Sequence, residues 1–127
     1  MVSEYDECTD SLVDHTVLTE LQAELGGDHS IVSAFVCNYV AMLPWRVARL
    51  HHALDNFDLE DAMDAVLSLK TSSHMVGAVC LRRLASELEI SMKLLPGAEH
   101  LGELIALVDE MDRVVFGTIG QLEAPLP

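Results

Sequence analysis

The sequence predicts an all-α protein, an antiparallel four-helix bundle with an additional short N-terminal helix. Half of the 127 residues are hydrophobic but only 5% are aromatic, which favours packed aliphatic helices over a sheet. Hydrophobic residues recur at three- and four-residue steps along four long segments, as they do on one face of a helix. The breaks between these segments are short, which favours antiparallel neighbours. The length suits a single domain over residues 1–127, in which residues 1–13 are expected to be a flexible acidic lead.

The first two helices are bounded by capping residues and glycines. Thr16 is a candidate N-cap for the short helix, and Gly26–Gly27 is expected to end it, because glycine commonly follows a helix C-terminus. Asp28 or Ser30 then begins a long helix, which Pro44 is expected to kink or divide in two. The apolar stripe of this long helix consists of Val32, Phe35, Val36, Tyr39, Leu43, Val47, Leu50 and Leu54.

Three further helices follow the break at Asn56–Phe57. Asp58 is the expected N-cap of the next helix, and Asp61 in its first turn suits the helix dipole. Gly77 allows a tight turn or a close helix contact, and Pro96–Gly97 ends the helix after it. The three predicted core stripes are Leu59, Ala62, Val66, Leu69, Ser73 and Val76; then Leu81, Leu84, Leu88, Met92 and Leu95; and last Leu101, Leu104, Ile105, Val108, Met111, Val115 and Leu122.

The charge pattern argues against nucleic acid as a partner. The net charge is −14, and no Lys or Arg precedes Arg46. The few basic residues include Lys70, Arg82, Arg83 and Lys93, which do not form the broad basic face that phosphate backbones require. The chain has no uninterrupted apolar run of about eighteen residues, and its first residues are acidic where a signal peptide is basic. We therefore expect a cytoplasmic protein that does not bind membranes.

Cysteine and histidine patterns predict neither a metal site nor a cofactor. Cys8, Cys37 and Cys80 are odd in number and lack a CxxC spacing, so reduced and mostly buried thiols are expected. His51–His52 and Asp55 offer an i,i+4 pair, but adjacent histidines point about 100° apart on a helix and no third ligand is evident. Glycine loops for phosphates, paired catalytic acids and nucleotide fingerprints are absent, so no enzymatic activity is expected.

The most informative stretch begins at Leu67 and reads LSLKTSSHMVGAVCLRRLASELE to Glu89. It resembles the signature of histidine-containing phosphotransfer (HPt) domains, roughly His-x-Leu-Lys-Gly-Ser-Ser-x-x-Leu-Gly-Ala-x-x-Leu-x-x-Leu-Cys-x-x-Leu-Glu. The residues in step are Leu69, Lys70, Ser72, Ser73, Val76, Gly77, Ala78, Leu81, Leu84, Ala85, Leu88 and Glu89. HPt domains often have a helix-starting Asp nine residues before the histidine, and Asp58 stands nine residues before position 67, which gives the same register. They also often have an aromatic in a long helix, a Leu-Pro pair and a Leu-x-x-Ala-Leu run upstream, which resemble Phe35, Leu43–Pro44 and the run from Leu50 to Leu54.

The resemblance places Leu67 where an HPt domain has its phosphorylated histidine. Leucine has no lone pair, so phosphoryl transfer at that position is excluded chemically. Lys70 resembles the cation that accompanies the phosphate, and Thr71 replaces the usual glycine. At about 100° per residue, Leu67 lies roughly 130° from the centre of the core stripe and is expected to be partly exposed. The predicted partner-binding residues are Met63, Leu67, Lys70, Thr71, His74 and Gly77.

Three functional hypotheses follow. The first, implied by the resemblance, is a pseudo-phosphotransfer adaptor that binds a response-regulator receiver domain or a histidine kinase without carrying phosphate. The second is an active carrier that uses His74, which lies about 20° from Leu67 in helix angle and about 10 Å along the axis. The third is a structural bundle that self-associates. The chain is expected to be a monomer or a weak homodimer.

Overall fold

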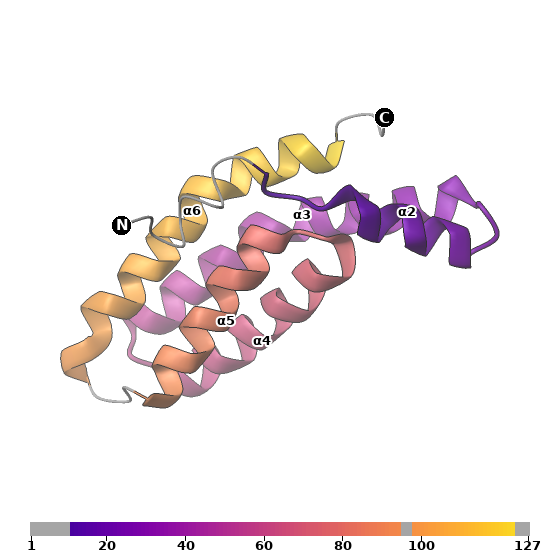
Figure 1. Ribbon diagram of the computed structural model, residues 1–127. Coiled ribbons are helices and arrows are strands. Elements are labelled where there is room, and N and C mark those ends of the chain that lie inside the picture. The colour runs from indigo at the N-terminus through magenta and orange to yellow at the C-terminus, as the bar shows by residue number, and fades with distance from the viewer. Residues whose placement is uncertain (1–10, 95–97, 124–127) are drawn as a thin grey trace.

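The computed structural model describes residues 11–94 and 98–123, and this part of the chain is helical without a strand (Figure 1). Its elements are α2 (His15–Glu24), α3 (His29–Asp55), α4 (Leu59–Val76), α5 (Val79–Leu94), the 3₁₀ turn η2 (Ala98–His100) and α6 (Leu101–Glu123). The all-α prediction is confirmed.

The four long helices enclose one core. α4 packs against α3 and α5, and α6 packs against the same two helices, while α2 extends from one end of the bundle and contacts α3 and α4 (Figure 1). The largest fully buried side chains come from all four long helices, and they are Leu43, Leu50, Leu54, Val66, Leu69, Val76, Leu81, Leu84, Leu88, Leu104, Val108 and Met111. The predicted stripes thus meet in a helical bundle, apart from Leu95, which with the predicted break at Pro96–Gly97 lies outside the described residues. An HPt-like topology stays a prediction.

Aspartates cap α2, α3 and α4. The carboxylates of Asp28 and Asp58 cap α3 and α4, and Asp58 accepts a hydrogen bond from the Asp61 amide at 3.0 Å. The prediction for the first helix was wrong by two residues, because Asp14 caps α2 and accepts from the backbone N–H of Thr16 at 3.0 Å. An aspartate satisfies a free N–H at a helix start as well as a threonine does.

α3 runs without a break from His29 to Asp55 and contains Pro44. The alternative in which Pro44 divides the helix is therefore wrong. Proline removes one helical hydrogen bond, but the neighbouring Leu43 and Val47 are buried and hold both sides of this point on the core. By length and composition α3 could also cross a membrane, which is weak evidence because core helices of soluble proteins pass the same test.

The N-terminal residues that the structure describes pack against the bundle. Where we expected an acidic lead through residue 13, Leu12 and Val13 are buried, and both of their amides donate to Oε1 of Gln121 at 3.0 Å. Residues 1–10 lie outside the described part of the chain.

The cysteines differ from the prediction of reduced and buried thiols. Cys37 is free but exposed, and Cys80 is buried but disulfide-bonded. Cys80 lies near the start of α5, where its amide donates to the carbonyl of Leu12 at 3.4 Å, so the buried segment of Leu12 and Val13 passes beside it. Cys8 lies outside the described residues.

One polar contact crosses the core between α3 and α4. The hydroxyl of Tyr39 lies 2.7 Å from the hydroxyl of Ser73, and both residues are buried. Burial raises the pKa of Tyr39 to about 12, against the lowering effect of the Ser73 hydrogen bond. The pair therefore holds a neutral phenol inside the bundle.

Replacing Tyr39 by phenylalanine is expected to lower the free energy of unfolding at pH 7 by about 1–2 kcal/mol, because the Ser73 hydroxyl loses its buried partner. In the wild type, stability also falls as pH rises from 10.0 to about 12, because the unfolded phenol ionises in this window while the folded one stays protonated. Urea midpoints of both proteins at pH 8 and 11 test this. An equal alkaline loss in Tyr39→Phe would show that another group is responsible.

Candidate functional site

The exposed side of α4 carries the residues predicted to bind a partner. Leu67 is 40% exposed in the middle of the helix, Thr71 and His74 are exposed, and Met63 and Lys70 are half-buried. Helix periodicity therefore placed Leu67 on the correct side of α4. These five residues form one surface, named here the α4 face.

Gly77 does not belong to the α4 face. It ends α4 in the left-handed conformation, with φ of 77°, and it is buried. Its carbonyl oxygen accepts a hydrogen bond from the Asp14 amide at 2.7 Å. A Cβ at this position would lie 2.4 Å from the Asp14 carbonyl oxygen, so packing alone requires glycine here.

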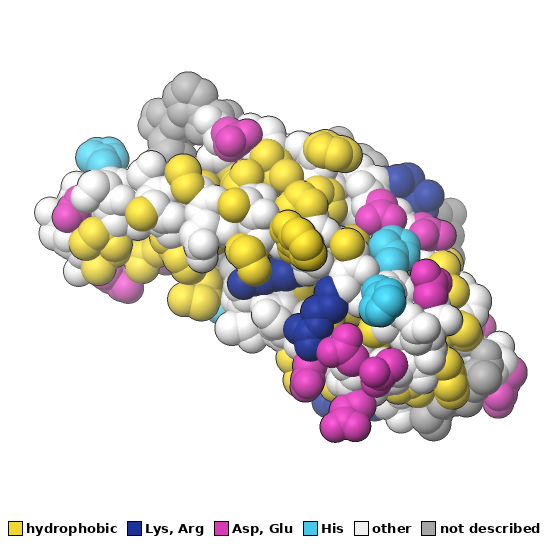
Figure 2. Space-filling model, turned by 180° about the vertical axis from the view of Figure 1, so that it is seen from behind, with side chains coloured by type: hydrophobic (Ala, Val, Ile, Leu, Met, Phe, Trp, Pro, Cys, Tyr) yellow, Lys and Arg dark blue, Asp and Glu magenta, His cyan; other side chains and the backbone are white. Residues whose placement is uncertain are grey.

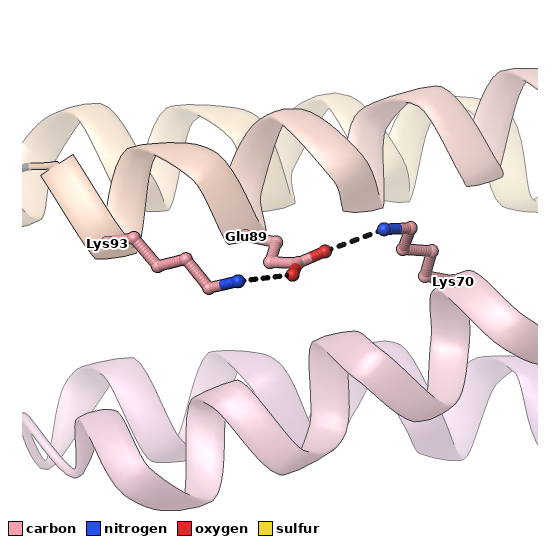
Figure 3. Close-up of polar contacts among 3 residues, drawn as sticks. All are labelled: Lys70, Glu89 and Lys93. Carbon is pink, nitrogen blue, oxygen red and sulfur yellow. Dashed lines mark hydrogen bonds and ion pairs between the residues drawn. The ribbon is translucent and has the colours of Figure 1, made fainter.

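Lys70 is bound to a carboxylate on the facing helix (Figure 3). Its Nζ lies 2.8 Å from Oε1 of Glu89, and Nζ of Lys93 lies 2.8 Å from Oε2 of the same residue. Hydrogen bonds from Lys70 and then Lys93 hold the pKa of the Glu89 carboxyl below its usual range. The charge of Lys70 is thus partly neutralised, which sequence reasoning missed although the i,i+4 spacing of Glu89 and Lys93 was visible.

Replacing Glu89 by glutamine is expected to remove part of the acid sensitivity of the fold. A carboxyl with a lowered folded pKa stabilises the protein above about pH 4.5, and this contribution is lost as pH falls through the folded value. The wild type should therefore lose more stability than Glu89→Gln between pH 6 and acid, measured as urea midpoints. Glu20→Gln on the exposed side of α2 is the matched control, and an equal response in both variants would contradict the assignment to Glu89.

A hollow lies between the end of α4 and the start of α5. Its lining residues are Lys70, Thr71, His74, Arg82, Arg83 and Ser86, and we call it the basic hollow. Nη1 of Arg82 lies 3.3 Å from Nδ1 of His74, so the guanidinium donates to the ring nitrogen. Sequence reasoning noted the basic residues but did not place them together with His74.

The outer face of α3 carries an apolar groove. Trp45 is 75% exposed and Met42 is 41% exposed, and Arg46, Ala48, Arg49, His52 and the α4 residue Ser68 complete the lining. Figure 2 shows hydrophobic side chains gathered across the middle of this side of the molecule, with basic side chains next to them. Sequence reasoning missed this groove, because the exposed Trp45 and Met42 lie outside the predicted core stripe.

His51 has different neighbours from those considered in the sequence. Ligand atoms of His51, Asp109 and Asp112 lie within 4.8 Å of one another, and Nε2 of His51 is 2.6 Å from Oδ2 of Asp112. Asp55 is not in this group. Exposed acidic groups often gather without an ion, and the hydrogen bond already occupies His51 and Asp112, so we assign no metal here.

No protein-family model, curated protein or solved structure matches this chain. The class that the structure defines is an all-α helical bundle. A functional assignment must therefore rest on the α4 face, the basic hollow and the chemistry of their side chains.

Proposed function

We propose that this chain is a pseudo-phosphotransfer adaptor of two-component phosphorelay signalling. Its α4 face binds a response-regulator receiver domain or a histidine kinase, and position 67 carries no phosphoryl group. The observation that carries this proposal is the exposed Leu67 at the centre of the α4 face, at the place where the HPt-like motif requires a histidine.

The α4 face has the composition of a binding surface. A single exposed leucine is ordinary on a soluble protein. Here Leu67 stands with Met63 along the helix axis, and Lys70, Thr71 and His74 surround it with polar groups. An apolar centre with a polar rim is typical of protein interfaces.

Charge gives the face a preferred partner. The chain carries 21 acidic and 7 basic residues, yet the basic hollow brings Arg82 and Arg83 next to Lys70 of the α4 face. Opposite charges speed encounter and reject wrong partners. A partner with an acidic or phosphorylated docking surface therefore fits, in agreement with the aspartyl phosphate chemistry that the HPt resemblance implies.

We place the protein in the cytoplasm, where such partners act. The disulfide at Cys80 is more typical of oxidising compartments. Alkylation of thiols in cells lysed under denaturing conditions, which expose the buried Cys80, tests this location by mass spectrometry. Cys80 that is labelled without a reductant would support the cytoplasmic location, and Cys80 that is labelled only after reduction would contradict it.

The test is binding of the purified chain to a panel of receiver domains and histidine kinase dimerisation domains, measured by calorimetry. Leu67→Glu is expected to weaken binding at least about tenfold, because it introduces a charge at the apolar centre. Phe116→Glu is the matched control, because Phe116 is 80% exposed on α6, which packs against α3 and α5. Equal losses in the two variants, or no binding to any domain of either class, would overturn the proposal.

His74 supports a second candidate, an active carrier with a displaced histidine. His74 is exposed, and the Arg82 guanidinium 3.3 Å away could stabilise a phosphoryl group on it. Incubation with a small phosphodonor, followed by mass spectrometry, tests this. Label that disappears in His74→Ala would establish the carrier and replace the adaptor proposal.

The apolar groove of α3 supports a third candidate, a bundle that self-associates. Trp45 is 75% exposed, and tryptophan is enriched among the residues that dominate interface energies. Sedimentation of the wild type and Trp45→Ser separates the candidates. A stable dimer that Trp45→Ser dissociates, in a chain that binds no receiver or kinase, would favour this candidate.

A further inference from the structure

We propose that the basic hollow is a binding site for a phosphoryl group, presented by the aspartyl phosphate of a receiver domain. The source of the phosphoryl group rests on the proposed adaptor function. The site itself rests on the side chains that line it. In this proposal the chain binds the phosphorylated and unphosphorylated states of its partner with different affinities and accepts no phosphoryl group.

The hollow concentrates the scarce positive charge of the chain. Lys70, Arg82 and Arg83 are three of its seven basic residues, and all three line the same hollow. Thr71 and Ser86 add two hydroxyl groups, and among the described residues no carboxylate belongs to the lining. Cations and hydroxyl donors around one space are the groups that bind phosphate oxygens.

Arg82 is the residue best placed to hold the anion. Its guanidinium has five N–H donors, and the contact found for it in the described residues is the 3.3 Å hydrogen bond to Nδ1 of His74. Within the described ranges it forms no ion pair with a carboxylate, unlike Arg49 with Asp61. A planar guanidinium with free donors can bind two oxygens of one phosphoryl group.

The electrostatics of α5 point the same way. The positive end of a helix dipole lies at its N-terminus, where anions are stabilised and cations are not. α5 has no acidic residue in its first turn, and Arg82 and Arg83 are its fourth and fifth residues. This arrangement is unfavourable for the isolated helix, and an oxyanion held by the two arginine side chains would offset it.

The hollow also lies next to the proposed docking surface. Lys70, Thr71 and His74 belong both to its lining and to the α4 face around Leu67. A receiver seated on Leu67 would therefore bring its phosphorylated aspartate close to Arg82. The unphosphorylated receiver would keep the apolar contact and lose the charged one, so the chain should bind the phosphorylated state more tightly.

The first experiment uses inorganic phosphate as the probe. In ¹H–¹⁵N NMR spectra at constant ionic strength, phosphate is expected to shift the Arg82 side-chain N–H and the Thr71 and Ser86 amides with saturation in the millimolar range. Arg82→Gln should weaken binding about tenfold or more, because it removes the charged donors. Arg113→Gln on α6 is the matched control, since Arg113 is basic but lies outside the lining. Shifts that fail to saturate, or equal losses in both variants, would overturn the site.

The second experiment uses a receiver domain that binds the chain, with and without beryllofluoride, which mimics the phosphoryl group on aspartate. Beryllofluoride is expected to tighten binding to the wild type about tenfold and to change binding to Arg82→Gln little. Equal affinities in both states, with Leu67→Glu still disruptive, would overturn the phosphoryl site and leave the adaptor function intact. Saturable phosphate binding by a chain that binds no receiver would support the phosphoryl site. It would contradict both the receiver as the source of the phosphoryl group and the adaptor function.

Discussion

Replacing Gly77 by alanine is expected to lower the free energy of unfolding by about 2–5 kcal/mol, from two separate costs. The first cost is the backbone conformation, because φ of 77° is unfavourable for a residue with a Cβ. The second cost is steric. The new Cβ would lie 2.4 Å from the Asp14 carbonyl oxygen and 3.0 Å from Cβ of Val17, so backbone has to move.

The consequences of that movement extend beyond one turn. The Gly77 carbonyl holds the Asp14 amide at 2.7 Å, and Asp14 caps α2. Only Gly77 and Ala78 separate α4 from α5, so a shift there displaces the start of α5 and the basic hollow with it. We therefore expect Gly77→Ala to weaken phosphate binding as well as stability.

Gly26→Ala is the matched control for this prediction. Gly26 has nearly the same backbone conformation, with φ of 72°, but a Cβ there would meet no atom within 4 Å. Its expected cost is about 1–2 kcal/mol, which is the conformational term alone. Urea denaturation of both variants gives the comparison. Equal losses would show that the contact between Gly77 and Asp14 contributes nothing.

The sequence predicted the helices well because their signals are local. The three- and four-residue steps fix which side of each helix faces inward, so the burial of Val66 and Leu69 and the exposure of Leu67 followed from periodicity alone. Gly77 was correctly expected to permit a turn or a close contact. The backbone of Asp14, which contacts Gly77, lies far earlier in the chain, and no local pattern reports such a contact.

The candidate site was predictable only where it lies on one helix. The pairing of Lys70 with Glu89 and the position of Arg82 beside His74 depend on how α4 and α5 pack. The disulfide of Cys80 was missed for a related reason, since an odd number of cysteines favoured free thiols. Distances between helices depend on tertiary packing, and helix periodicity does not predict them.

Replacing Leu67 by histidine is expected to turn the chain into a phosphoryl acceptor, which would confirm the HPt-like register. The side chain at position 67 is 40% exposed, so an imidazole there would be accessible to a phosphodonor. Imidazole supplies the nucleophilic nitrogen that leucine lacks. The measurement is the mass increase of one phosphoryl group after incubation with phosphoramidate, with the modified residue located by peptide sequencing.

Two neighbours are expected to limit the reaction. The charge of Lys70 is partly neutralised by Glu89, whose Oε1 lies 2.8 Å from Nζ of Lys70. Thr71 adds bulk where the HPt pattern has glycine. The labelled fraction should therefore be higher in the double variant that combines Leu67→His with Thr71→Gly than in Leu67→His alone. It should rise again in the triple variant that adds Glu89→Gln, because Lys70 then no longer faces a carboxylate. Replacing threonine by glycine at position 71 costs roughly 0.3–0.5 kcal/mol of helix stability, so each variant is first checked for a cooperative unfolding transition.

His74 must be separated from the histidine introduced at position 67. The combination of Leu67→His with His74→Ala should keep its label, and wild-type protein under the same conditions should acquire none at position 67. If the folded triple variant that combines Leu67→His, Thr71→Gly and Glu89→Gln remains unlabelled, position 67 is not equivalent to the phosphorylated histidine of an HPt domain. The resemblance would then be confined to the helical pattern, and the α4 face would lose its link to phosphorelay partners.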